Sequence, residues 1–241
     1  MKIIEKFKMK LGDHYKGEGV TIAFLGDSVT QGSFELYKNG EKSCETVYCQ
    51  RSSYEMRVFE ILSMLYPSVP INIINAGIAG DTAPWGCERV DRHVIRHEPD
   101  LCVVCYGLND CGYDPDRPER YRKAITGIFD KLEAAGIEIL FMTPNMMNTT
   151  VSPHITDPYI KEIAQAKAGY QNGGYFDKLI DIAREVCGER GIPVCDCYAI
   201  WKRLHESGVD TTELLANKIN HPTPDMNRMF AYELVRCMLE K

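Results

Sequence analysis

Short apolar runs recur along the chain, separated by longer segments that mix apolar and polar positions. Each run is four to six residues long and mostly apolar, without strict alternation of apolar and polar residues. This pattern is typical of strands that are buried on both faces of a sheet. We therefore predict five strands, at Val20–Leu25, Ile71–Asn75, Leu101–Tyr106, Ile137–Met142 and Ile192–Cys195.

The segments between the runs carry the signals of helices. In one of them, Met56, Phe59 and Leu62 lie near helical spacing, and in another Pro118 opens a segment that closes at Gly136. Proline at the start and glycine just past the end are common at helix termini. The predicted helices are Ser53–Tyr66, Pro84–His97, Pro118–Ala135, Pro158–Gly169, Tyr175–Cys187 and Pro224–Leu239.

Alternating strands and helices predict the fold class. Such a chain pairs its strands in parallel through right-handed crossovers, which gives a three-layer α/β/α sandwich. The 241 residues show no repeat, low-complexity tract or long linker, so we expect one domain over residues 1–241. Residues 1–19 are an N-terminal extension, an arm or a strand. Residues 34–51 are expected to be a long loop, serving as a lid or as a contact in a homo-oligomer.

Composition and charge exclude several classes of function. Lys and Arg total 28 against 34 Asp and Glu, so the net charge is −6 and no basic run marks a nucleic-acid surface. Charges interrupt the first ten residues, which argues against a signal peptide. No stretch approaches the roughly 20 apolar residues that span a bilayer. We therefore expect a cytoplasmic protein without a membrane span.

The ten cysteines are expected to be reduced thiols rather than disulfides, because the chain is long and shows no secretory signal. Cys102 and Cys105 form a CxxC pair inside a predicted strand. Residues three apart in a strand face opposite sides, so this pair is poorly placed to bind one metal ion. No metal site is predicted.

Polar clusters follow three of the predicted strands, and a fourth precedes the last helix. They are Gly26–Thr30, Asn75–Thr82, Gly107–Asp110 and Asn220–Pro222. In a sheet of parallel strands, ligands bind at the carboxyl ends of the strands, near the topological switch point. We therefore expect all four clusters to converge on one edge of the sheet.

Acyl transfer is the chemistry that these clusters favour. A serine such as Ser28 needs a general base within hydrogen-bond reach, usually histidine. The tetrahedral intermediate needs preorganised donors. Gly80 allows close approach of its N–H because it has no side chain, and Asn109 offers an amide donor. Asp27 is expected to brace its loop rather than to transfer protons.

Four blocks in this order resemble the GDSL/SGNH hydrolase superfamily. They are Gly26-Asp27-Ser28, Gly80 within Asn75–Thr82, Gly107-x-Asn109-Asp110 and the His221-Pro222 pair. The resemblance implies a flavodoxin-like sheet of five parallel strands and ester hydrolysis. Ser28 would be the nucleophile and His221 the base. The oxyanion hole would comprise the Ser28 and Gly80 N–H groups and the Asn109 side chain, supported by Asp27 and Asp110, with no metal or organic cofactor.

One position departs from the family pattern. The last block is usually Asp-x-x-His, but Lys218 stands three residues before His221. Loss of the orienting aspartate costs about 10⁴-fold in rate in the best-studied triad. Either a backbone carbonyl orients His221 in a dyad, which we favour, or another polar residue substitutes for the aspartate. The nearest candidates are Asn220, Asp210 and Asp225.

The function predicted from these residues is a serine esterase that acts on a small-molecule ester, with an O-acetylated carbohydrate as the favoured substrate. A lysophospholipase or thioesterase is the alternative enzyme, since proteins similar to this one act on those substrates. A ligand-binding protein with a weakened His221 is an alternative of another class. A flavin or phosphate binder that uses Ser28–Ser33 as its cradle is a third.

Overall fold

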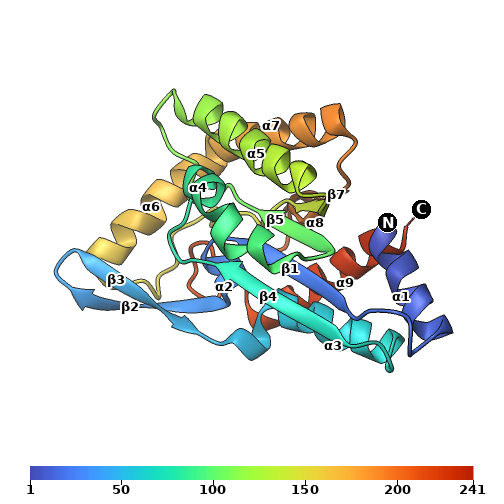
Figure 1. Ribbon diagram of the computed structural model, residues 1–241. Coiled ribbons are helices and arrows are strands. Elements are labelled where there is room, and N and C mark those ends of the chain that lie inside the picture. The colour runs from blue at the N-terminus through green and yellow to red at the C-terminus, as the bar shows by residue number, and fades with distance from the viewer. Residues whose placement is uncertain (241) are drawn as a thin grey trace.

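A five-stranded parallel sheet forms the centre of the protein, as shown by a computed structural model that describes residues 1–240 (Figure 1). Lys241, the last residue of the predicted domain, lies outside the described residues. The strand order is β4-β1-β5-β6-β7. The strands are β1 (Val20–Gly26), β4 (Ile71–Gly77), β5 (Leu101–Cys105), β6 (Glu138–Met142) and β7 (Val194–Cys195).

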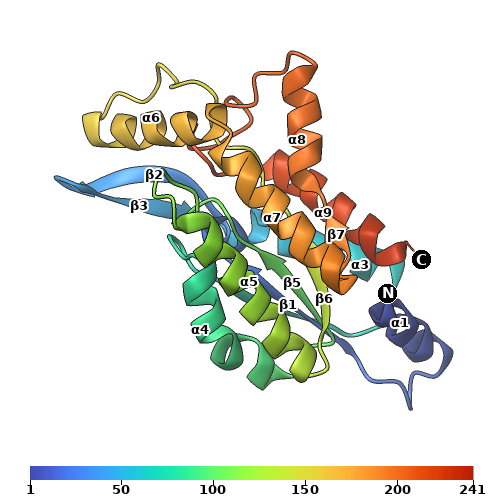
Figure 2. The same ribbon diagram turned by 90° about the horizontal axis from the view of Figure 1, so that it is seen from above.

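Helices cover both faces of this sheet, which makes the three layers (Figures 1 and 2). One group lies on the face that is uppermost in Figure 1 and comprises α4 (Ala83–His93), α5 (Arg117–Ala134) and α7 (Tyr175–Arg190). The opposite face carries α1 (Lys2–Gly12), α3 (Tyr54–Leu65) and α9 (Pro224–Leu239). The remaining helices are α2 (Ser28–Gln31), α6 (Pro158–Asn172), α8 (Cys197–Glu206) and the 3₁₀ turns η1 (Gln50–Ser52) and η2 (Ile95–His97).

The predicted fold class is confirmed, and each of the five predicted strands is present. The apolar runs predicted them well because β5 is buried at all five positions and β1 at six of seven. The six predicted helices are also present, with ends shifted by a few residues. No helix within residues 1–240 is long and apolar enough to cross a membrane.

Parallel register brings the strand ends to one level. Gly26 at the end of β1 pairs with Gly77 of β4 on one side and with Cys105 of β5 on the other. A Cβ atom on Gly77 would lie 2.3 Å from the backbone nitrogen of Gln31 in α2, so only glycine lets α2 approach the end of β4 this closely. The chain segments that follow these three strands therefore start side by side.

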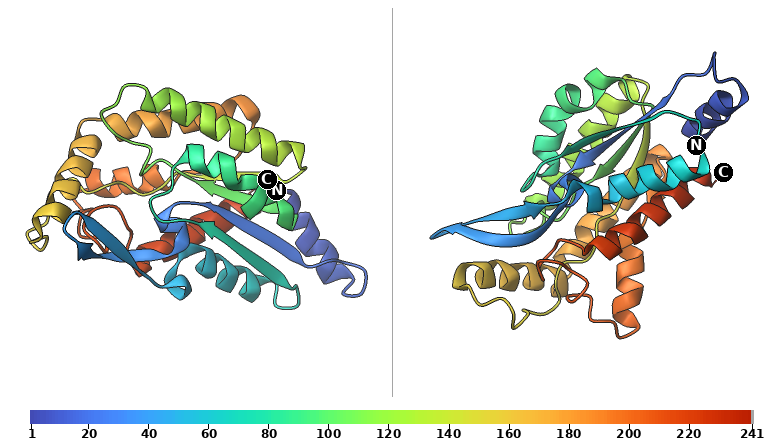
Figure 3. Two further views of the ribbon diagram at one scale, coloured as in Figure 1. Left: turned by 60° about the vertical axis from the view of Figure 1, so that its left-hand side comes forward. Right: turned by 90° about the horizontal axis from the view of Figure 1, so that it is seen from below.

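The long loop expected at residues 34–51 is instead a β-hairpin. Strands β2 (Ser33–Gly40) and β3 (Ser43–Tyr48) pair antiparallel and project beyond the central sheet, beside α6 (Figures 2 and 3). The prediction was wrong because most side chains of both strands are exposed, so the segment has no apolar run. An ion pair of 3.0 Å between Lys38 and Asp157 ties the hairpin to the start of α6.

The N-terminal extension is a helix, not a strand. Ile3, Ile4 and Phe7 of α1 are buried, and the Phe7 ring stacks on Tyr66 at a centroid distance of 4.4 Å. The remaining turns are exposed and rich in lysine, which hid the short apolar face of this helix in the sequence. Helix α1 therefore belongs to the hydrophobic core.

Replacement of Phe7 by alanine tests this docking. We expect Phe7→Ala to lower the free energy of unfolding by about 3–5 kcal/mol, because it leaves a cavity against Tyr66. Met9→Ala on the exposed side of the same helix should change it by less than about 0.5 kcal/mol. Urea unfolding measures both values, and equal values for the two variants would contradict the packing of α1.

Candidate active site

Ser28 stands where β1 passes into the short helix α2. The Asp27 carboxylate caps this helix by accepting a hydrogen bond of 2.9 Å from the Val29 N–H. Thr30 shares a hydrogen bond of 2.8 Å with the Tyr54 hydroxyl, which fixes the other side of the turn. Asp27 therefore braces the loop, as the sequence suggested. Burial raises the pKa of Asp27 to about 7, so this carboxyl is partly protonated at neutral pH.

The imidazole of His221 lies between the Ser28 hydroxyl and a backbone carbonyl. Its Nε2 is 2.9 Å from Ser28 Oγ, and its Nδ1 is 2.9 Å from the carbonyl oxygen of Phe34. A carbonyl oxygen can only accept, so Nδ1 carries the proton and donates it. In the neutral ring, Nε2 is then free to accept the hydrogen bond from Ser28. This geometry is what a serine nucleophile and its general base require.

The orienting partner of His221 is thus the Phe34 carbonyl in the hairpin strand β2, which is the dyad arrangement. The three side-chain candidates have other partners. Asp210 accepts from the Thr212 N–H, Asn220 accepts from Asn217, and Asp225 lies exposed near Arg228. Those candidates were therefore wrong. Lys218 donates to Glu213.

Burial lowers the pKa of His221 to about 4, since the apolar surroundings disfavour the imidazolium. The positive charge of Lys167 adds to this effect, and the hydrogen bond to Phe34 opposes it. At neutral pH the ring is therefore unprotonated and ready to accept a proton.

Gly80 and Asn109 lie in the same cavity as Ser28 and His221, with a volume of about 330 Å³. The four blocks of the sequence therefore meet, as predicted. Gly80 has a φ of +77°, a left-handed conformation that glycine adopts without strain. One N–H of the Asn109 amide is held by the Asp81 carbonyl at 3.0 Å, which leaves the second N–H of that amide for a ligand. Asp110, next to Asn109 in the chain, accepts a hydrogen bond of 2.9 Å at Oδ1 from the Ala83 N–H.

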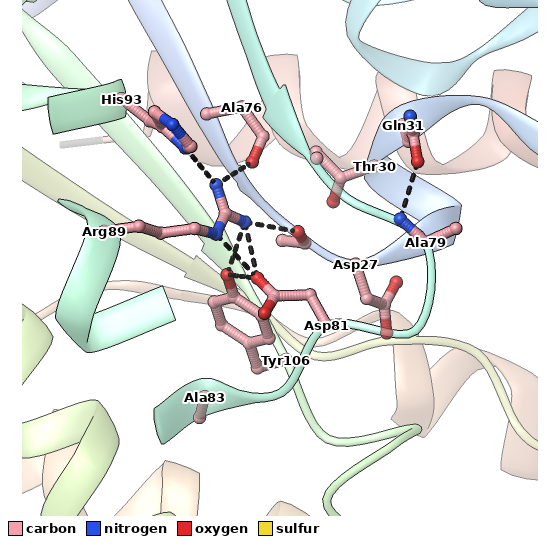
Figure 4. Close-up of polar contacts among 12 residues, drawn as sticks. Asp27, Thr30, Gln31, Ala76, Ala79, Asp81, Ala83, Arg89, His93 and Tyr106 are labelled. Atoms are coloured by element: carbon pink, nitrogen blue, oxygen red, sulfur yellow. Dashed lines mark hydrogen bonds and ion pairs between the residues drawn. The ribbon is translucent and has the colours of Figure 1, made fainter. Parts of the chain in front are cut away.

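A buried ion pair connects the segments that carry these groups (Figure 4). Arg89 of α4 donates to Asp81 Oδ2 from Nε and Nη2, at 2.8 and 2.6 Å. The same guanidinium donates to the carbonyls of Ala76 and Gly26, at the ends of β4 and β1. The Tyr106 hydroxyl, at the end of β5, donates to Asp81 at 2.7 Å. One network thus joins the three strand ends next to Ser28, Gly80 and Asn109.

Sequence reasoning missed several groups of this site. Phe34 acts through its carbonyl, so its side-chain type carried no signal. Gln31 holds the segment before Gly80 by accepting from the Ala79 N–H at 2.6 Å. Arg89 lies on a predicted helix, where an arginine is ordinarily exposed. Lys167 on α6 lines the cavity, although it is far from all four blocks in the sequence.

The GDSL-like lipase/acylhydrolase family model matches residues 24–229, which include Ser28, Gly80, Asn109 and His221. The chain belongs to this family.

Curated and solved relatives of this GDSL-like chain include esterases. It is 30% identical over 118 residues to an acetylxylan esterase of Geobacillus stearothermophilus, and the match spans 49% of this chain and 51% of that relative. A two-domain esterase active on acetylated mannans superposes with a TM-score of 0.68 at 18% identity, covering 98% of this chain and 53% of that one. An acetyl xylan esterase, AlAXEase, gives 0.67 at 17% identity, covering 91% of this chain and 100% of that one. At these identities the solved structures establish the shared fold.

The protonation state of His221 can be measured directly. We expect its ring Cε1–H signal in NMR spectra to titrate with a midpoint near pH 4, because burial lowers the pKa. The signal is identified among the six histidines as the one missing from His221→Gln. A midpoint near 6.5 would show that the ring is solvated and not enclosed as described.

Loss of the arginine in the buried network should destabilise the fold. Arg89→Met leaves the Asp81 carboxylate buried without its cation, and we expect a loss of about 3–5 kcal/mol in the free energy of unfolding. Tyr106→Phe removes a single hydroxyl and should cost about 1–2 kcal/mol. Arg92→Met changes an exposed arginine of the same helix and serves as the control. Equal unfolding midpoints in urea for Arg89→Met and Arg92→Met would contradict the network.

Proposed function

We propose that the protein is a serine esterase that removes short acyl groups, acetyl above all, from O-acetylated carbohydrate. The observation that carries the proposal is the line from Ser28 Oγ through the imidazole of His221 to the Phe34 carbonyl. Ser28 and His221 border a cavity that Gly80 and Asn109 also border. Family membership supports the hydrolase reaction.

The acylation step follows from the protonation state of the dyad. Ser28 Oγ attacks the ester carbonyl carbon while its proton passes to His221 Nε2. The imidazolium keeps its Nδ1–H on the Phe34 carbonyl and then delivers the Nε2 proton to the leaving alcohol oxygen as the ester C–O bond breaks. Water then attacks the acyl-enzyme by the same route, and His221 first accepts and then returns a proton.

Three donors would bind the negative oxygen of each tetrahedral intermediate. The Ser28 N–H is at the first position of α2, where backbone N–H groups have no acceptor within the helix. The Gly80 N–H and the Asn109 side-chain amide complete the set. All three are neutral dipoles. Asp27 and Asp110 would support them by fixing the backbone on which they stand.

Two observations support acetylated sugar as the substrate. The cavity is small, about 330 Å³, and its border mixes apolar residues such as Leu36 and Ile163 with polar ones such as Thr46, which suits a short acyl group next to a hydroxylated alcohol. The curated relative and both structural neighbours described above are named for acetylated polysaccharides. The alternative lysophospholipase or thioesterase would require room for a long acyl chain or a thiol carrier.

Location and assembly are part of the proposal. All ten cysteines are free thiols, which supports a reducing compartment such as the cytoplasm.

A homo-oligomer would bring a second copy to the projecting hairpin, and sedimentation at several protein concentrations tests it.

The test is hydrolysis of p-nitrophenyl acetate, butyrate and octanoate and of acetylated xylo- and manno-oligosaccharides. We expect activity to fall with chain length and to drop by at least about 10³-fold in Ser28→Ala. The exposed Ser68→Ala serves as the matched control. Preference for octanoate would replace the substrate class with a lipid. Wild-type rates equal to those of Ser28→Ala would favour a ligand-binding protein.

A further inference from the structure

A lysine ammonium is held at the catalytic cavity by helix α6. Ile163 and Lys167, one helical turn apart, both border the cavity that contains Ser28, Asn109 and His221. The Lys167 Nζ donates to the carbonyl oxygen of Leu108 at 2.5 Å. Leu108 immediately precedes Asn109, so this bond anchors the cation next to the proposed oxyanion donor. An ammonium has three N–H donors, and this bond uses one of them.

The other charged group that borders the cavity is already bonded elsewhere. Glu45 accepts hydrogen bonds from the Tyr37 hydroxyl and the Asn39 amide within the hairpin. Tyr37 and Glu45 are paired in the hairpin register, so their side chains lie on one face of it. The Glu45 carboxylate therefore serves the hairpin rather than the lysine.

Burial lowers the pKa of Lys167 below its usual value, and nearby acidic groups oppose that shift. Cys111, Asp27 and Asp110 act to raise this pKa, and Arg117 acts to lower it further. Burial raises the pKa of Asp27 to about 7 and that of Asp110 to about 6, so near pH 6 both carboxyls carry only part of a negative charge. The Cys111 thiol has a pKa raised to about 11 by burial and is neutral. Arg117 is itself a cation.

We propose that Lys167 stabilises the negative charge that forms on the ester carbonyl oxygen when Ser28 attacks. The inference rests on the proposed serine-esterase function and adds a charge to an oxyanion hole that otherwise consists of neutral dipoles. A cation fixed in a partly buried cavity interacts more strongly with a developing charge than it would in water. Its anchoring on Leu108 means that little reorganisation is needed during the reaction.

No proton leaves Lys167 in this role. The bond that forms joins Ser28 Oγ to the carbonyl carbon, and the electron pair of the carbonyl π bond moves to oxygen. The serine proton goes to His221. The same cation disfavours the imidazolium, and it lowers the pKa of His221. We therefore attribute the gain in rate to the position of Lys167 on the Leu108 carbonyl, next to Asn109, where the negative oxygen would be bound.

Two substitutions separate the charge from the hydrogen bond. Lys167→Gln keeps a donor for the Leu108 carbonyl but removes the charge, and Lys167→Arg keeps both. Lys161→Gln removes an exposed lysine of the same helix and is the control. With p-nitrophenyl acetate we expect Lys167→Gln to lower kcat about ten- to a hundredfold with little change in KM. Lys167→Arg should recover most of the loss.

A pH profile gives a second readout that a structural role would not move. In Lys167→Gln, the acidic limb of kcat/KM should shift to higher pH, because loss of the cation raises the pKa of His221. Wild-type kcat in Lys167→Gln would overturn the proposal. Equal losses of kcat in Lys167→Gln and Lys167→Arg, together with lowered unfolding midpoints, would also overturn it. That result would show that Lys167 only holds the Leu108 carbonyl in place. An effect on KM alone would assign it to substrate binding and overturn it as well.

Failure of the esterase proposal can be told apart from failure of this one. Phosphonylation of Ser28 by a fluorophosphonate also builds negative charge on an oxygen beside Ser28, without any need for the natural ester. A reactive wild type whose rate falls in Lys167→Gln but not in Lys161→Gln supports the role of Lys167, and unchanged rates overturn it. A wild type that neither hydrolyses esters nor reacts with the probe removes the proposed function and this inference with it.

Discussion

The hydrogen bond from His221 Nδ1 to the Phe34 carbonyl is the contact on which the arrangement of the site depends. It fixes the tautomer of the ring and leaves Nε2 as the acceptor for Ser28. The acceptor is available because Gly32, at a φ of +86°, ends α2 and turns the chain into the hairpin. Because a carbonyl is neutral, it orients the ring but lacks the negative charge with which an aspartate would stabilise the imidazolium. The lowered pKa of His221 is consistent with that difference.

The convergence of Ser28, Gly80 and Asn109 has a second cause, the level ends of three neighbouring strands. Parallel register places the ends of β4, β1 and β5 side by side, and hydrogen bonds of the Arg89–Asp81 pair to Ala76, Gly26 and Tyr106 join them (Figure 4). A buried ion pair adds little net stability when it is intact and costs much when one partner is lost. Here the ion pair fixes the position of site residues, because Asp81 directly follows Gly80 and the Asp81 carbonyl holds the Asn109 amide.

Burial governs the ionisation of the groups around the cavity. Burial raises the pKa of the Asp27 and Asp110 carboxyls and lowers that of His221 and Lys167, so it shifts all four groups toward their neutral forms. Helix α6, which carries Lys167, is tied to the hairpin by the pair of Lys38 and Asp157. The hairpin that orients His221 and the helix that carries Lys167 are therefore linked to each other as well as to the cavity.

The sequence by itself determined the sheet, its covering helices and the four blocks of the site. Buried strands need nearly continuous apolar runs, and the residues that follow Val20–Leu25, Ile71–Asn75 and Leu101–Tyr106 must meet where parallel strands end. The tertiary structure decided what those residues contact. The hairpin was missed because exposed strands need no apolar pattern. A backbone carbonyl was expected to orient His221, but Phe34 as its source was missed because a backbone group has no residue type to recognise. Lys167 was missed because contacts between distant segments depend on how the layers pack.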